Sequence, residues 1–197
     1  MKTRKEPGMQ KCQVCGKNEA TVIRVSYHVE DLLGMRVGVS NCVEKAVCKA
    51  CGEEVITIPD VNGLIAAAAV ARVMVPTKLN GTEIKFLRKA IGISAKKLAE
   101  ILKVRPETVS RWENDDTQQI GNSDEKLFRI IVGHSIKDGE EDKAPAMDYS
   151  EREIIEMNFN PLRVVDDAPL LNFARVKVKI NNKKIQEAWD DTELMAA

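Results

Sequence analysis

Residues 82–114 constrain the fold more than any other part of the chain. Apolar residues recur there at helical spacings, and the breaks at 92–93 and 103–104 are too short for anything except tightly angled helices. Ser94 stands where the second helix needs an N-cap, and Pro106 falls in the first turn of the third helix, where its missing N–H costs nothing. The apolar positions are Phe86, Leu87, Ile91, Leu98, Ile101, Leu102, Val109 and Trp112. The pattern predicts a helix-turn-helix.

Charge is distributed unevenly, although the chain of 197 residues has a formal net charge of zero. Between residues 78 and 112, nine basic residues outnumber three acidic ones, which gives a local charge of +6. Between residues 137 and 153, seven acidic residues outnumber three basic ones, which gives −4. Such asymmetry is typical of a DNA-binding module joined to a separate partner or tail. We therefore expect the third helix to enter the major groove of double-stranded DNA.

Four of the five cysteines form two CxxC pairs, each followed by glycine: Cys12 with Cys15, and Cys48 with Cys51. This spacing lets two thiolates of one tight turn bind the same tetrahedral Zn²⁺, and a glycine at positive φ lets nearby N–H groups turn toward the sulfurs. The two pairs predict a zinc ribbon with one structural Zn²⁺. A module of this size has little core and gains folding energy from its metal.

The segment between the two pairs is longer than in most ribbons, and it carries strand patterns of its own. Residues 21–29 and 33–39 alternate between apolar and polar, and residues 55–58 form a further short apolar strand. These patterns predict a small antiparallel sheet that the metal site closes.

Other uses of the cysteines are less favoured. Neither CxxC pair opens a helix after a strand, as a redox pair does, and four thiolates leave no coordination position for a catalytic water. Cys42 is interpreted as a small buried hydrophobe or a free thiol. His28 is interpreted as a surface residue, with a role as a substitute metal ligand as the alternative.

An apolar stretch at 64–75 contains a single charge, Arg72, and is too short to span a membrane. We expect a buried connecting helix within residues 61–81, with packing against a second copy of the chain as the alternative. Thr82 is expected to cap the next helix, and residues 124–132 to form a later helix that closes the domain.

Residues 93–114, ISAKKLAEILKVRPETVSRWEN, resemble the Xre/Cro family of phage-type repressors. With two CxxC pairs in front, the sequence resembles the YgiT-type zinc-finger regulators, whose relatives include MqsA-type antitoxins. The resemblance covers about residues 10–135. It implies a transcriptional repressor that binds a DNA operator as a homodimer, and, for an antitoxin, a toxin protein as a second partner.

The resemblance also implies roles for individual residues. Arg111 is expected to contact a guanine edge and Glu107 a cytosine amino group; because the family usually has Gln or Asn at position 107, the prediction depends mainly on Arg111. Arg88 and Glu113 match a partly buried ion pair, and Trp112 is expected in the core. The expected phosphate contacts, which position the protein without specifying sequence, are Lys96, Lys97, Arg105, Thr108 and Ser110.

The C-terminal extension, residues 137–197, begins with an acidic, breaker-rich linker. We expect a helix at 149–157 capped by Ser150, a strand at 173–180 with one polar face, and a last helix at 183–194. The extension is expected to pair across a dimer, to cover the ribbon or to bind a partner.

The sequence therefore predicts an α+β chain with four parts: a zinc ribbon with antiparallel strands (1–60), a connecting helix (61–81), an all-α, five-helix Xre/Cro-like helix-turn-helix domain (82–136) and a small α/β extension. We expect a cytoplasmic, DNA-binding transcriptional regulator. The alternative is a zinc-ribbon adaptor that binds protein and not a specific DNA sequence. An enzyme using Cys42 or His28 is not expected, because no catalytic set of residues accompanies them.

Overall fold

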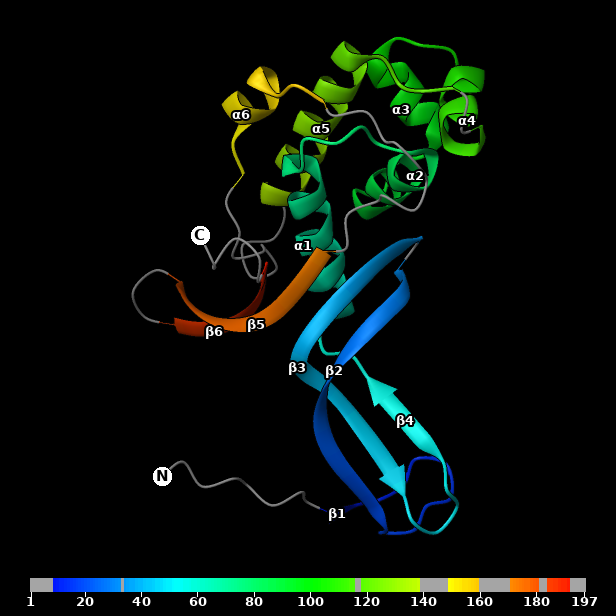
Figure 1. Ribbon diagram of the computed structural model, residues 1–197, viewed down its shortest axis with the longest axis vertical. Coiled ribbons are helices and arrows are strands. Elements are labelled where there is room, and N and C mark those ends of the chain that lie inside the picture. Colours follow the sequence, from blue (N-terminus) through cyan, green and yellow to red (C-terminus); the bar gives the residue numbers. More distant parts are fainter. Residues whose placement is uncertain are drawn as a thin grey trace.

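The computed structural model describes residues 9–32, 34–115, 118–138, 149–159, 171–180 and 184–191. The molecule is elongated: the helices gather at one end, and a long β-hairpin projects from them toward the other end (Figure 1). No helix in these ranges is long and apolar enough to cross a membrane.

The strands form one sheet around a long antiparallel hairpin of β2 (Ala20–Leu32) and β3 (Met35–Cys48). At its far end, β1 (Met9–Gln10) pairs with β2, and β4 (Glu54–Thr57) pairs with β3. At the end near the helices, β5 (Leu171–Ile180) joins β3 in parallel, and β6 (Lys184–Asp191) pairs with β5. The order is β1-β2-β3-β5-β6, with β4 attached to β3 beside this path.

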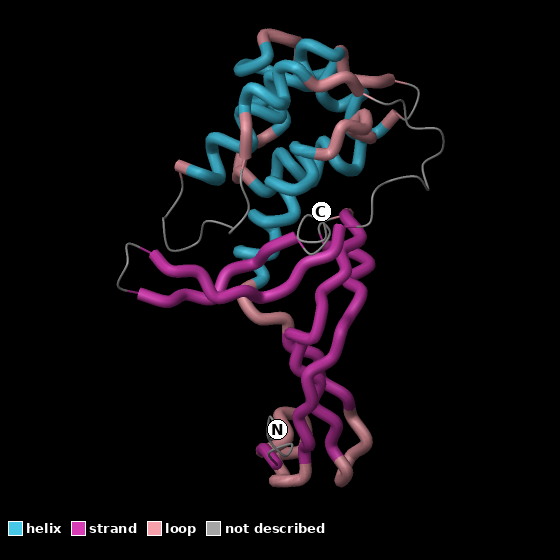
Figure 2. The backbone as a smooth tube through the Cα atoms, turned by 60° about the vertical axis from the view of Figure 1, so that its left-hand side comes forward, coloured by secondary structure: helices cyan, strands magenta, loops and turns pink. Residues whose placement is uncertain are grey.

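The predicted antiparallel strands around the cysteines are confirmed, but their faces differ along the hairpin. Near the helices, Val37, Val39 and Phe173 are buried. Toward the far end, Ile23 and Ile56 are 44% and 39% exposed, although the alternating pattern predicts a half-buried face. The difference arises because the helices cover only the half of the sheet nearest to them (Figures 1 and 2).

Six helices are found in the described ranges, and the first is the buried connecting helix predicted from the apolar stretch. They are α1 (Val61–Met74), α2 (Gly81–Ala90), α3 (Ala95–Leu102), α4 (Pro106–Asn114), α5 (Asn122–Lys137) and α6 (Glu151–Glu156). α1 packs against β5, β6 and three other helices of the same chain.

Helix capping confirms one prediction and corrects another. Ser94 caps α3 as predicted, because its hydroxyl accepts from the N–H of Lys97. The prediction that Thr82 caps α2 is wrong. Asn80 is the N-cap, because its side chain accepts from the N–H of Glu83 while Glu83 accepts from the N–H of Asn80, a reciprocal capping box.

The five-helix domain and the last helix of the extension also need correction. The predicted domain has four helices, α2 to α5, and the described ranges contain six in all, with α1 before it and with α6, which Ser150 caps as predicted and which packs on α5. Residues 184–191 form strand β6 and not a helix. Ile185, Ala188 and Trp189 fall at spacings that suit a helix, but pairing with β5 over its whole length decides the conformation.

A buried network of five charged side chains joins α1 to α2 and α5. Arg72 of α1 donates through Nε and Nη2 to Glu83 of α2, at 2.5 and 2.8 Å. Arg129 of α5 donates to Glu125 and to the carbonyls of α1 and the turn after it, and Lys78 donates to Glu125 at 2.9 Å. All five are at most 9% exposed. The partners of Arg72 were not predicted from the sequence; the available signal was a lone charge in a buried helix, since such a charge requires a counter-charge.

Candidate metal centre and nucleic-acid interface

The four predicted cysteine ligands converge at the far end of the hairpin. Cys12 and Cys15 lie in the turn between β1 and β2, and Cys48 and Cys51 lie where β3 turns toward β4. All four Sγ atoms lie within 4.8 Å of one another, and all the cysteines are free thiols. Residues distant in sequence therefore form one four-sulfur cluster.

The spacing of the sulfurs suits a tetrahedral ion. The Sγ atoms of Cys12 and Cys51 are 3.8 Å apart, and those of Cys15 and Cys48 are 3.7 Å apart. Four sulfurs at about 2.3 Å from a central metal, the usual zinc–sulfur distance, lie about 3.8 Å from one another. A disulfide would instead need about 2.05 Å. The cluster is thus a possible metal-binding site with the dimensions of a four-thiolate centre.

Two matching turns hold the cysteines. Gly16 and Gly52 have φ of 75° and 76°, and their N–H groups donate to the carbonyls of Cys12 and Cys48 at 3.0 and 2.8 Å. Only glycine adopts this backbone conformation without strain. The N–H groups of Cys15 and Val14 point at the Cys12 sulfur and lower the pKa of its thiol to about 6, which favours the thiolate that a metal requires.

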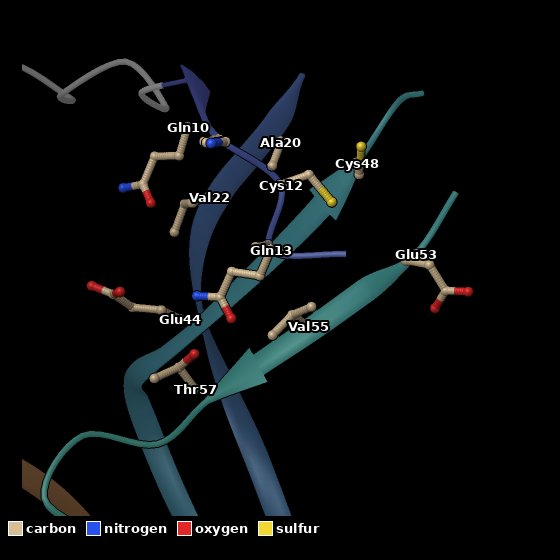
Figure 3. A pocket seen from close by; sticks show the side chains of 12 residues that line it. Gln10, Cys12, Gln13, Ala20, Val22, Glu44, Cys48, Glu53, Val55 and Thr57 are labelled. Carbon is tan, nitrogen blue, oxygen red and sulfur yellow. The ribbon is translucent and has the colours of Figure 1, made fainter. Parts of the chain in front are cut away.

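A shallow hollow lies beside the cluster on one face of the hairpin. In Figure 3 the side chains of Val22 and Val55 lie along it, with Cys12 and Cys48 at one end and Glu44 and Thr57 at the other. Its volume is about 60 Å³, which is room for water molecules and not for an organic ligand.

His28, the alternative ligand, and Cys42, the fifth cysteine, are not part of the cluster. His28 is exposed on β2, as its polar position predicts, and belongs to no metal-ligand group among the described residues. Cys42 is buried, and burial raises the pKa of its thiol. Its sulfur accepts a hydrogen bond from the backbone N–H of Arg175 on β5.

The second candidate site is the outer face of α4. Val109 and Trp112 point into the core with 0% and 7% exposure, as predicted. Glu107 and Arg111 are exposed on the other side of the helix. Arg105 is the N-cap, and Pro106 lies in the first turn as predicted. The helix therefore presents one polar face to solvent while its other face is fixed by packing.

The residues expected to contact phosphate lie on α3 and α4, which pack against each other. Lys96, Lys97, Arg105 and Ser110 are exposed, whereas Thr108 is half-buried. Lys97 forms a 3.5 Å ion pair with Glu100, exposed on both sides and therefore weak.

One predicted ion pair fixes the position of α4. Arg88 of α2 donates through Nε and Nη2 to the Glu113 carboxylate at 2.6 and 2.9 Å, and through Nη1 to the carbonyl of Ile93 at 2.9 Å. The side chains are 12% and 5% exposed, so the pair is screened little by water. Glu113 in turn raises the pKa of Arg88. The pair joins the first and third helices of the predicted helix-turn-helix.

Comparison with known proteins agrees with this geometry. A helix-turn-helix family profile matches residues 84–120. The chain is 30% identical to the HTH-type transcriptional regulator DicA of Escherichia coli (strain K12) over 117 residues, which cover 54% of this chain and 86% of that protein. The chain belongs to the Xre-family helix-turn-helix transcriptional regulators. No solved structure matches this regulator.

The family assignment confirms part of the sequence analysis. The regulator is a DNA-binding protein, and its matched residues run from α2 to the segment before α5. That match does not reach the cysteine cluster, so the likeness to YgiT-type and MqsA-type proteins stays a prediction.

Proposed function

We propose that the regulator is a sequence-specific repressor that reads its operator with the exposed face of α4. The observation that carries the proposal is the placement of Arg111. It lies on the solvent side of a short helix whose opposite side is held by Val109, Trp112 and the Arg88–Glu113 pair. None of the ion pairs within the described ranges uses Arg111, so its guanidinium can bind a ligand.

A guanidinium presents two parallel N–H donors, which match the O6 and N7 acceptors of guanine in the major groove. Glu107, one turn earlier on the same helix, can accept from a cytosine amino group. The basic residues of α3 and of the α4 N-terminus would then bind phosphates on either side of the groove.

The test is a binding titration with DNA selected from a random pool by the full-length protein. Arg111→Ala should lose about 1–3 kcal/mol, roughly 5- to 150-fold in Kd, and should lose preference at one base pair. Arg152→Ala, an arginine on α6 that is 86% exposed, is the matched control and should bind as the wild type does. Equal affinity and preference in Arg111→Ala would remove this residue from base recognition.

The phosphate contacts make a separate prediction. Lys97→Ala should weaken binding to all sequences alike and reduce the dependence of log Kd on log salt by about one. Failure to select any preferred sequence, together with recovery of a protein partner, would instead favour the adaptor function.

We also propose that the four-sulfur cluster holds one structural Zn²⁺. Its sulfur spacing and closed, four-thiolate donor set support this, since a closed shell has no position for substrate. Bound zinc would supply folding energy to the far end of the hairpin. Elemental analysis should find one zinc per chain. Cys48→Ser should lose the metal and Cys42→Ser should retain it; a metal-free wild type with an intact hairpin would disprove the proposal.

The partners of the regulator are proposed from family analogy. A homodimer would place two α4 helices on half-sites about one helical turn apart, so footprinting should show a two-fold pattern. A toxin partner is testable by co-expression with the product of the neighbouring gene. If the two proteins do not associate, the regulator acts as a stand-alone repressor.

A further inference from the structure

A fork in the sheet borders a second, larger cavity of about 470 Å³, which is partly open to solvent. β5 pairs with β3 only as far as Ser40 and Ala174, and β4 pairs with β3 only from Glu44 onward. Between these points β3 has neither neighbour along that edge, and the β5–β6 hairpin diverges from the β2–β3 hairpin (Figure 2). The cavity volume lies within the range of small-molecule sites.

Charged and polar side chains from every strand around the fork line this cavity. Three basic residues, Arg24, Arg175 and Lys177, outnumber the two acidic ones, Glu44 and Glu187. Arg24 and Glu44 form an exposed pair at 3.9 Å. Lys177 is exposed and takes part in no ion pair among the described residues. The lining therefore carries one positive charge in excess.

Arg175 is the least satisfied of the buried or half-buried arginines in the part of the chain that the structure describes. Its Nη1 donates to Asp60 at 3.0 Å, its Nη2 is 3.8 Å from Glu187, and its buried Nε–H has no acceptor among the described residues. Its side chain is 16% exposed and lies over the Trp189 ring. A buried donor without a partner costs free energy that an added acceptor would recover.

Other arginines of this chain show which ligand the Nε and Nη2 donors of Arg175 can hold. Arg72 and Arg88 each use the Nε and Nη2 donors to hold both oxygens of a glutamate. In Arg175 the same edge has an unbonded Nε and an Nη2 beyond hydrogen-bond distance from Glu187. This edge has the geometry for a planar carboxylate.

The two carboxylates that line the cavity do not occupy this edge, because Glu187 stays 3.8 Å from Nη2 and Glu44 pairs with Arg24. Cys42 lines the cavity and accepts from the backbone N–H of Arg175, but burial raises the pKa of the thiol, so it stays neutral. We propose that the fork is a binding site for a small organic carboxylate, held on the Nε–Nη2 edge of Arg175 and attracted by Lys177.

Such a ligand would bind next to the start of α1. Asp60, which Arg175 contacts, is the N-cap of α1 and accepts from Gly63, and its carbonyl accepts from Trp189. The other end of α1 is bonded to α2 through Arg72 and Glu83. Binding in the fork would thereby influence the DNA-binding helices, a consequence that rests on the proposed function.

Calorimetric titration of the full-length, metal-loaded protein tests the site without DNA. The probes are L-lactate, succinate and L-glutamate, with lactamide as the uncharged analogue and inorganic phosphate as the competing anion. At least one carboxylate should bind with a Kd of about 1 mM or tighter, and lactamide should not. No binding by any carboxylate, or equal binding by lactamide, would overturn the proposal; preference for phosphate would refute the carboxylate assignment.

Variants locate the binding. Arg175→Lys keeps the charge but removes the planar edge, and should weaken binding about tenfold, the value of one charge-assisted hydrogen bond. Lys177→Gln should weaken it less, and Arg152→Lys not at all. If circular dichroism shows that Arg175→Lys is misfolded, Lys177→Gln still tests the location of the site, because an exposed side chain can be replaced without disturbing the fold. Unchanged affinity in Lys177→Gln and in a folded Arg175→Lys would remove the ligand from the fork.

Discussion

Removal of the Glu83 carboxylate should destabilise the helical end of the protein more than any surface change. The side chain is 2% exposed and accepts three hydrogen bonds, from Nε and Nη2 of Arg72 and from the N–H of Asn80. Arg72 is fully buried, so Glu83→Ala leaves its positive charge in the core without its counter-ion. Breaking a buried pair in this way costs about 3–5 kcal/mol.

The loss is measurable by guanidinium denaturation followed by far-UV circular dichroism. A loss of about 4 kcal/mol corresponds to a fall in Tm of about 10 °C for a chain of this size. Glu100→Ala is the matched control: its ion pair with Lys97 is exposed, with side chains 54% and 60% accessible, and its removal should cost at most about 0.5 kcal/mol.

A double-mutant cycle isolates the pair from its surroundings. Replacing both Arg72 and Glu83 with Met removes both charges, and Arg129 still donates to the carbonyls of Val75 and Thr77. The double variant should therefore lose less stability than the sum of the losses in Arg72→Met and Glu83→Met, by about 2 kcal/mol or more. A Glu83→Ala loss below about 1 kcal/mol, or strict additivity in the cycle, would refute the coupling.

Three further outcomes follow from close contacts. Gly81→Ala should lower the free energy of unfolding in chemical denaturation by about 1–3 kcal/mol, because the added Cβ would lie 2.6 Å from the Trp112 carbonyl oxygen. Gly121→Ala is the control and should be tolerated, because the nearest atom to its added Cβ would be 3.5 Å away. Glu113→Gln should raise the Kd for DNA without changing base preference, because it weakens the Arg88–Glu113 ion pair that fixes the position of α4. Burial raises the pKa of Tyr149 to about 12, so its contribution to stability should be complete below about pH 10 and disappear as the pH rises through 12, with a late step in tyrosinate absorbance that Tyr149→Phe abolishes.

Local signals in the sequence predicted the parts of the structure that depend on neighbouring residues. Ser94 and Pro106 mark helix starts because capping and the first-turn position are decided within four residues. The CxxC-glycine spacing predicted both turns of the cysteine cluster for the same reason. The alternation of apolar residues predicted strands at 21–29 and 33–39, but not the continuation of β3 to Cys48.

The features that were not predicted from the sequence depend on contacts between residues that are distant along the chain. Residues 184–191 are a strand because β5 is beside them, and their own side chains also suit a helix. Asn80 replaced Thr82 as the cap because Glu83 serves both the capping box and the buried Arg72. The fork in the sheet arises where β3 exchanges one neighbour for another, a feature that no local pattern encodes.

The parallel pairing of β3 with β5 also has a consequence for biosynthesis. Val37 pairs with Leu171, so β3 is synthesised well before β5, and its segment around Val37 waits for that partner. Helices α2 to α5, whose contacts are local, can pack in the meantime, since short-range contacts form faster than long-range strand pairing. Until β5 arrives, the inner edge of β3 is open to other strands. Truncation before residue 171 should therefore favour aggregation of an otherwise folded helical domain.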